Sequence, residues 1–121
     1  MEKNRVNKPK IKGTQAESAF VKNERVLQGF PLIERRSLSG ANDQGDISGM
    51  VGLCIEIKNQ KSYKIPEWLK ETAVERVNAK ADYGILVIKP NGVGLGSVED
   101  WWAVMRVGDI LDLLKDAGYG A

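Results

Sequence analysis

Hydrophobic positions along the 121-residue chain recur with helical spacing in some stretches and alternate as in β-strands in others. The helical stretches predict helices over residues 15–29, 66–81 and 109–117. The β-rich runs predict extended segments over residues 31–36, 45–58, 84–89 and 101–106, the second of them a hairpin. This order predicts one α/β domain over residues 13–121, with a mixed central β-sheet flanked by helices.

The first two helices show recognisable starts. Thr14-Gln15-Ala16-Glu17 has the form of a capping box, which predicts a helix from about Gln15 to Gly29. Residues 1–12 are polar and basic and are expected to be a flexible arm. Pro66 suits the first turn of the second helix, whose apolar face is expected to contain Leu69, Ala73, Val77 and Ala81.

The segment from Gly45 to Lys58 holds the most informative pattern. Side chains alternate in a strand, so Leu53, Ile55 and Ile57 are expected on one face and Cys54, Glu56 and Lys58 on the other. A hairpin turn near Met50-Val51 would set Asp46 opposite or nearly opposite Glu56. Two carboxylates so close favour a cation between them, and oxygen ligands suit Mg²⁺. The alternative is an exposed, simply charged hairpin face.

Composition narrows the possible chemistry. The chain has no histidine and one cysteine, Cys54, which excludes a Cys/His zinc site and a Ser-His or Cys-His nucleophile pair. An enzyme with this composition would depend on carboxylates, lysines and a hard metal ion. The net charge is only +2, but residues 1–36 carry nine basic and four acidic residues, a net +5. This basic end either contacts phosphates or solubilises the chain.

Other features exclude further classes. The apolar runs are too short for a membrane span and the N-terminus lacks the pattern of a secretion signal, so a soluble cytoplasmic protein without a membrane partner is expected. Gly92-Val93-Gly94-Leu95-Gly96 lacks the lysine of a phosphate-binding loop, and no nucleotide cofactor is expected. Trp101 and Trp102 are expected to divide between the core and the surface.

Gly45-Asp46, ten residues before Glu56-Ile57-Lys58, resembles the PD-(D/E)xK nuclease core, with Gly45 where the name of the motif has proline. A wider pattern resembles phage-type Holliday junction resolvases, which are similar to the archaeal resolvases, over about residues 10–106. It consists of Lys12-Gly13-Thr14 with Glu17, Gly29-Phe30-Pro31, Glu34-Arg35-Arg36-Ser37 and Gly40-x-x-Asp43-x-Gly45-Asp46-Ile47. The resemblance implies a restriction-endonuclease-like fold.

The resemblance also implies roles for individual residues. Asp46, Glu56, the carbonyl of Ile57 and Glu17 would hold Mg²⁺, for which Mn²⁺ would substitute. Lys58 would stabilise the attacking water and the charge that develops on phosphorus. Glu17, Asp46, Glu56 and Lys58 are therefore the expected catalytic residues. Glu17 has an alternative role as a helix cap on Thr14.

Basic and polar residues around this core are the expected DNA contacts. The resemblance points to an arginine of the pair Arg35 and Arg36, one of which is expected to face the site, and to Ser39. Further candidates for phosphate contacts are Lys10, Lys12, Lys61 and Lys64. The alternative for all of them is solvated surface. Glu71 and Glu75 lie one turn apart and could approach the metal, but such residues more often mark the solvated face of a helix.

The resemblance thus implies a metal-dependent endonuclease of DNA recombination and repair, of phage type. It would resolve four-way (Holliday) DNA junctions by symmetric phosphodiester hydrolysis. A homodimer matches the two-fold symmetry of a junction, and Trp102, Met105 and the last helix are candidates for its interface. The alternatives are a nuclease of the same core with another substrate, such as a flap, mismatch or restriction-like enzyme, and a non-catalytic DNA-binding module.

Overall fold

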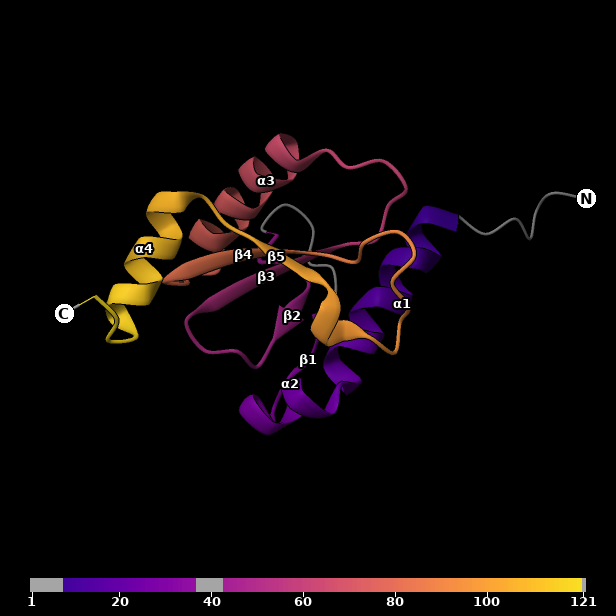
Figure 1. Cartoon of the computed structure of the whole chain (residues 1–121), viewed down its shortest axis with the longest axis horizontal. Coiled ribbons are helices and arrows are strands. Elements are labelled where there is room, and N and C mark those ends of the chain that lie inside the picture. Colours follow the sequence, from indigo (N-terminus) through magenta and orange to yellow (C-terminus); the bar gives the residue numbers. More distant parts are fainter. Residues whose placement is uncertain (1–7, 37–42, 121) are drawn as a thin grey trace, which may run out of the picture.

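The computed structural model of the chain describes residues 8–36 and 43–120, and a β-sheet lies in it between helices on both faces (Figure 1). The elements in chain order are α1 (Lys8–Lys22), α2 (Glu24–Gly29), β1 (Glu34–Arg35), β2 (Ile47–Ser48), β3 (Leu53–Lys58), α3 (Ile65–Asn78), β4 (Tyr83–Ile88), the 3-10 helix η1 (Val98–Asp100), β5 (Trp102–Val104) and α4 (Val107–Asp116). Within the described part of the chain, no helix has the length and apolar character needed to cross a membrane.

The larger sheet has the order β3-β4-β5 and mixed strand directions. β3 and β4 are parallel, with Leu53 opposite Tyr83 and Lys58 opposite Ile88, whereas β5 runs antiparallel to β4. α3 connects the two parallel strands, as a parallel pair requires a crossover. The expectation of an α/β chain with a mixed sheet flanked by helices is confirmed.

The alternation expected along β3 is also confirmed. Ile55 and Ile57 belong to a core cluster with Ala16 and Phe20 of α1, on one face of the sheet. On the other face, Trp68 of α3 packs against Leu86 and Ile88 of β4. Both faces of the sheet are therefore covered, and the side chain of Glu56 is carried into the interior with 4% of its surface exposed.

The expected first helix is wrong in two respects. α1 begins at Lys8, seven residues before Gln15, so part of the expected flexible arm is helical. The helix also breaks at Asn23, whose side chain accepts hydrogen bonds from the N–H groups of Arg25 (3.1 Å) and Val26 (3.3 Å) and starts α2. Thr14 lies inside α1, so the capping-box role of Glu17 is wrong as well.

The expected hairpin does not form a regular ladder. β2 pairs instead with β1, placing Arg35 opposite Ile47. A backbone hydrogen bond from Asp46 N–H to the Ile55 carbonyl (2.9 Å) crosses to β3 in the expected register. The next donor of β3, the N–H of Ile57, binds the Asp46 side chain rather than a backbone carbonyl, which ends the pairing there.

The predicted apolar face of the helix after Pro66 is right for Leu69, which packs against the core, and Ala81 is buried just after the helix, but the face is wrong at Val77. α3 buries Trp68, Thr72 and Glu75, whereas Val77 is 61% exposed. Trp68 is the largest apolar side chain of this helix, and its packing fixes which face of α3 lies against the sheet. Glu75 follows seven residues later, two turns along the same face, and is buried with it.

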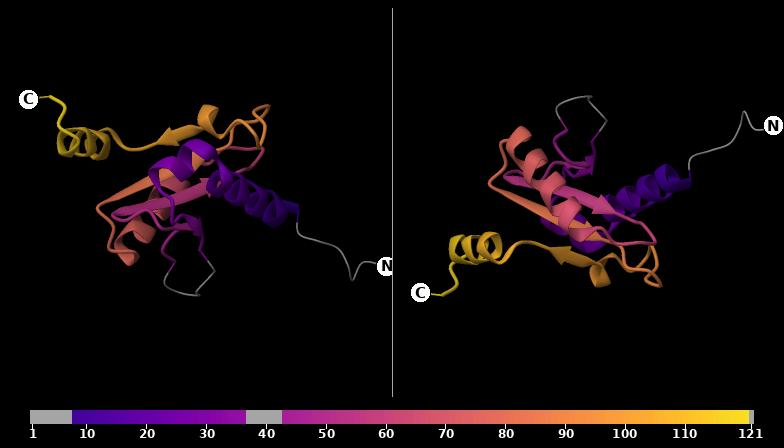
Figure 2. Two further views of the ribbon diagram at one scale, coloured as in Figure 1. Left: turned by 90° about the horizontal axis from the view of Figure 1, so that it is seen from below. Right: turned by 90° about the horizontal axis from the view of Figure 1, so that it is seen from above.

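The last elements agree with the expectation. Trp101 is buried at 8% exposure and Trp102 is 48% exposed, so the predicted division of the pair between core and surface is confirmed. α4 buries none of its residues and lies at one end of the molecule (Figure 2). Its apolar side chains Val107, Leu111 and Leu114 are exposed.

A pair of glycines provides a matched test of this fold. Gly49 (φ +88°) and Gly92 (φ +85°) share a left-handed backbone, but a Cβ at Gly49 would overlap the Leu32 carbonyl whereas one at Gly92 meets open space. We expect Gly92→Ala to lower the free energy of unfolding by about 1 kcal/mol, and Gly49→Ala to lower it by roughly 2 kcal/mol more. Urea denaturation measures both, and equal losses would contradict the packing of the β1–β2 segment.

Candidate metal and phosphate site

Asp46 is held against the open edge of β3. Its N–H donates to the Ile55 carbonyl at 2.9 Å, and its Oδ2 accepts from the Ile57 N–H at 2.7 Å. Its own carbonyl accepts from the N–H of Arg36 at 2.8 Å, which attaches the β1 segment to the same point. The carboxylate of Asp46 is thereby fixed beside the strand that carries Glu56 and Lys58.

Lys58 lies among carboxylates and an aromatic ring. Its Nζ is 3.1 Å from Oε2 of Glu56 and donates hydrogen bonds to Glu71 Oε1 (3.0 Å) and Oε2 (3.2 Å). It also lies 5.8 Å from the ring centroid of Trp68, within the range of a cation–π contact. These contacts hold the ammonium group of Lys58 close to Glu56.

α1 brings a third carboxylate to the site. Glu17 Oε1 accepts from Arg35 Nε at 3.1 Å, an ion pair between α1 and β1. The position of α1 is fixed in part by Asn59, whose side-chain amide donates to the Lys12 carbonyl at 3.1 Å. Asn59 directly follows β3, and its role was not predicted, since a polar residue after a strand carries no signal of such a contact.

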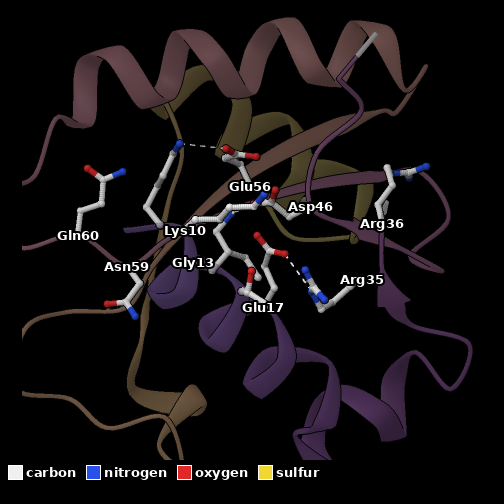
Figure 3. A pocket seen from close by; sticks show the side chains of 12 residues that line it. Lys10, Gly13, Glu17, Arg35, Arg36, Asp46, Glu56, Asn59 and Gln60 are labelled. Carbon is white, nitrogen blue, oxygen red and sulfur yellow. Dashed lines mark hydrogen bonds and ion pairs between the residues drawn. The ribbon is translucent and has the colours of Figure 1, made fainter. Parts of the chain in front are cut away.

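These residues border one pocket of about 510 Å³. In Figure 3, Asp46 lies between Glu17, which comes from α1, and Glu56, which comes from the strand on the opposite side. The lining residues are Lys10, Gly13, Thr14, Glu17, Arg35, Arg36, Asp46, Glu56, Ile57, Lys58, Asn59 and Gln60. All five expected catalytic and metal-ligating residues are therefore in one place, although they come from α1, the segment before β2, and β3.

The expected DNA contacts divide into two groups. Lys10, Arg35 and Arg36 line the pocket. Only one of the two arginines was expected to face it. Both do, because strand β1 ends at Arg35 and the alternation of side chains between its two faces does not continue to Arg36. The Arg36 guanidinium donates to Gln44 Oε1 (3.2 Å) and to the Ile47 carbonyl (3.3 Å). The pocket lining does not include Lys12, Lys61 or Lys64, and Ser39 lies outside the described residues.

Two acids of α3, Glu71 and Glu75, lie next to Glu56 and Lys58. From the sequence, both were expected on the solvated face of the helix. Glu75 is 1% exposed, and Glu71 pairs with Lys58. One carboxylate oxygen from each of Glu56, Glu71 and Glu75 lies within 4.8 Å of the others, so these three side chains could hold a metal ion. The burial of Glu75 follows from the position of Trp68 on the same helix.

Burial and repulsion raise the pKa values of Glu56, Asp46 and Glu75. Burial also acts to raise the pKa of Glu71, but the hydrogen bonds with Glu56 and Lys58 outweigh it and the net shift is downward. Burial, with the nearby Glu71 and Asp46 carboxyl groups, raises the pKa of Glu56 to about 12. Burial raises the pKa of Asp46 to about 6, against the opposing hydrogen bond from Ile57, and that of Glu75 to about 7. Burial lowers the pKa of Lys58, but Glu56 and Glu71 outweigh it and the net shift is upward. The ammonium group of Lys58 therefore balances only part of the acidic group formed by Asp46, Glu56, Glu71 and Glu75.

The comparisons with known proteins found no relative of this chain. No protein-family model matches the chain, and neither a curated protein nor a solved structure does.

The raised pKa of Glu75 predicts how stability depends on pH. In the folded chain this pKa is about 7, against 4.5 for the ordinary group. Between these values the folded state binds more protons than the unfolded state, so the stability present below about pH 4.5 is lost as the pH rises to about 7. Glu75→Gln cannot ionise, and its advantage over wild type should grow by on the order of 2–3 kcal/mol from pH 4.5 to pH 7.5.

Urea denaturation in the presence of a chelator measures this difference. Glu67→Gln, on the exposed first turn of the same helix, is the matched control and should follow the wild type at every pH. An advantage of Glu75→Gln that stays constant with pH, or grows on acidification, would contradict the burial of an ionisable Glu75.

Proposed function

We propose that this chain is a magnesium-dependent endonuclease that hydrolyses phosphodiester bonds in DNA, with four-way junctions as its substrate. One observation carries the proposal: Glu17, Asp46, Glu56 and Lys58, expected to act together, border a single pocket that Lys10, Arg35 and Arg36 also line. Three carboxylates supply metal ligands, and the basic side chains supply contacts for phosphate. The proposal includes a restriction-endonuclease-like core as the finer description of the fold.

The residues of the pocket fit a hard cation. Oε1 of Glu56 is buried and has no hydrogen-bond partner among the described residues, so an electron-rich oxygen is left without a donor. Asp46, Glu56, Ile57 and Glu17 all line the pocket. Their carboxylate groups and the backbone carbonyl of Ile57 offer oxygen atoms, the ligands that Mg²⁺ and Mn²⁺ prefer. When bound, Mg²⁺ lowers the pKa of a water molecule and neutralises phosphoryl oxygens.

The chain's own groups would then position the phosphodiester. Lys58 keeps an ammonium group at the boundary between the pocket and the acids of α3, where it can stabilise negative charge that develops on phosphorus. Arg35, 41% exposed in its side chain and paired with Glu17, can exchange part of that pair for a phosphate oxygen. Ile57 and Asp46 fix the floor of the pocket through their mutual hydrogen bond.

A homodimer is part of the proposal. A four-way junction presents two equivalent strands for cutting, which two subunits related by a two-fold axis can reach together. The exposed apolar side chains of α4 (Val107, Leu111, Leu114), together with Trp102 on β5, are the surface that we propose for this contact. Burial of such side chains between subunits is the usual source of dimer stability.

Substitutions in the pocket test the catalytic assignment. We expect Asp46→Asn, Glu56→Gln and Lys58→Ala each to slow magnesium-dependent cutting by about a hundredfold or more, because each removes a ligand or a charge from the pocket. Circular dichroism and junction binding in Ca²⁺ should stay close to wild type. The control is Asp100→Asn, an exposed acid of η1. A variant that still cuts at the wild-type rate would show that the substituted residue is not part of the catalytic site.

The choice of substrate is tested separately. A synthetic four-way junction and a linear duplex of the same sequence are incubated with the protein and Mg²⁺, Mn²⁺, Ca²⁺ or a chelator. We expect paired, symmetric cuts in the junction with Mg²⁺ or Mn²⁺, and much slower cutting of the duplex. Equal cutting of both would contradict the junction specificity but still support a nuclease. If neither DNA is cut with either metal, the proposal of a nuclease is wrong.

A further inference from the structure

Glu75 is a buried acid whose charge has no partner in the described part of the chain. It is 1% exposed, and no N–H or hydroxyl donor of the described residues reaches Oε1 or Oε2. Its one side-chain partner there is another acid, Glu56, and the two can share a hydrogen bond only while one of them keeps its proton. An ionised carboxylate in such a position costs several kcal/mol unless a cation or donors compensate it. Oε1 of Glu56, on the strand that α3 covers, is unpartnered in the same way.

The neighbouring cation does not balance this group of acids. The Nζ of Lys58 is already in contact with Glu56 Oε2 and with both oxygens of Glu71. Without a cation, the raised pKa values of Glu56 and Glu75 keep protons on these acids. A divalent cation that displaces those protons would meet three carboxylates and one ammonium, a net charge of −2 that it neutralises. Asp43 adds to the repulsion that Glu75 experiences.

The oxygen atoms are close enough to share one ion. One oxygen from each of Glu56, Glu71 and Glu75 lies within 4.8 Å of the others. Oxygens bound to one Mg²⁺ or Ca²⁺, at about 2.1–2.5 Å from it, are separated by about 3–5 Å. The Glu71 side chain is 41% exposed, which gives an ion access from solvent. Glu56 and Glu75 are buried and lie on the interior side of the three oxygens.

These acids do not all face the pocket. Neither Glu71 nor Glu75 belongs to its lining, whereas Glu56 does. Trp68 and Thr72 place Glu75 on the buried side of α3, against the face of the sheet opposite α1. Glu56 is therefore the one acid common to the pocket and to the α3 face.

We propose that Glu56, Glu71 and Glu75 form a second divalent-cation site, on the α3 face of β3, which shares Glu56 with the pocket. The site takes a hard cation such as Mg²⁺, Mn²⁺ or Ca²⁺, because all of its protein ligands are carboxylates. Cation binding there compensates the buried charge of Glu75 and stabilises the folded chain. This site does not require that the chain cuts DNA.

Titration of the full chain with Mn²⁺, followed by calorimetry and by the electron paramagnetic resonance of free Mn²⁺, tests the site. Wild type should bind roughly two ions. Glu75→Gln should lose one of them or bind it at least about tenfold more weakly, and Asp46→Asn should keep the ion that Glu75 holds. Glu67→Gln, an exposed acid on the same helix, is the control and should bind as wild type.

Thermal unfolding gives a second readout. Mn²⁺ should raise the Tm of Asp46→Asn, and the double variant Asp46→Asn/Glu75→Gln should lose that rise. If Glu75→Gln does not fold, Glu71→Gln, at a partly exposed position, should show the same loss of one ion. A Glu75→Gln or Glu71→Gln chain that folds and binds Mn²⁺ as wild type does would overturn the proposal.

The outcomes also separate this site from the proposed function. If wild type cuts no DNA but Glu75→Gln loses one Mn²⁺, the second cation site is supported and the nuclease is contradicted. If wild type cuts junctions but Glu75→Gln binds Mn²⁺ as wild type does, the nuclease is supported and the second cation site is contradicted.

Discussion

Two hydrogen bonds between Asp46 and β3 are the constraint on which the site depends. One runs from the Asp46 N–H to Ile55 and the other from the Ile57 N–H to the Asp46 carboxylate. The opposite edge of β3 is occupied by β4, so the free edge is where an incoming segment can bind. In the second bond, the Asp46 side chain takes the place of the backbone carbonyl that would pair with Ile57 in a regular hairpin. Without it, the Asp46 carboxylate would have no fixed position relative to Glu56.

The position of Glu56 follows from the layered fold. A sheet covered on both faces buries alternate residues of its parallel strands on each side, and apolar side chains normally fill both. β3 obeys this rule on the α1 face with Ile55 and Ile57 and departs from it on the α3 face, where Glu56 faces Glu75. Burial and nearby carboxylates raise the pKa values of Glu56 and Glu75, and Lys58 lies beside Glu56 and Glu71 as a partial counter-charge. Such departures from local stability are expected at functional sites.

Part of this arrangement is predictable from the sequence. The alternation along residues 53–58 places Glu56 and Lys58 on one face, and the composition leaves a hard metal as the available chemistry. The rotation of α3 is not predictable from its apolar pattern, because Leu69, Ala73 and Val77 have the helical spacing while the single large side chain of Trp68 decides which face is buried. The early start of α1 and the side-chain bond of Asp46 also depend on tertiary contacts, with Asn59 among them, that carry no local signal.

The most direct test of the central claim is anomalous diffraction from crystals of the full chain soaked in Mn²⁺. We expect an anomalous peak in the pocket, at about 2.0–2.3 Å from a carboxylate oxygen of Asp46 and one of Glu56. A protein whose ordered Mn²⁺ lies only on exposed acids such as Asp109 or Asp112, with Asp46 and Glu56 turned away from each other, would contradict it.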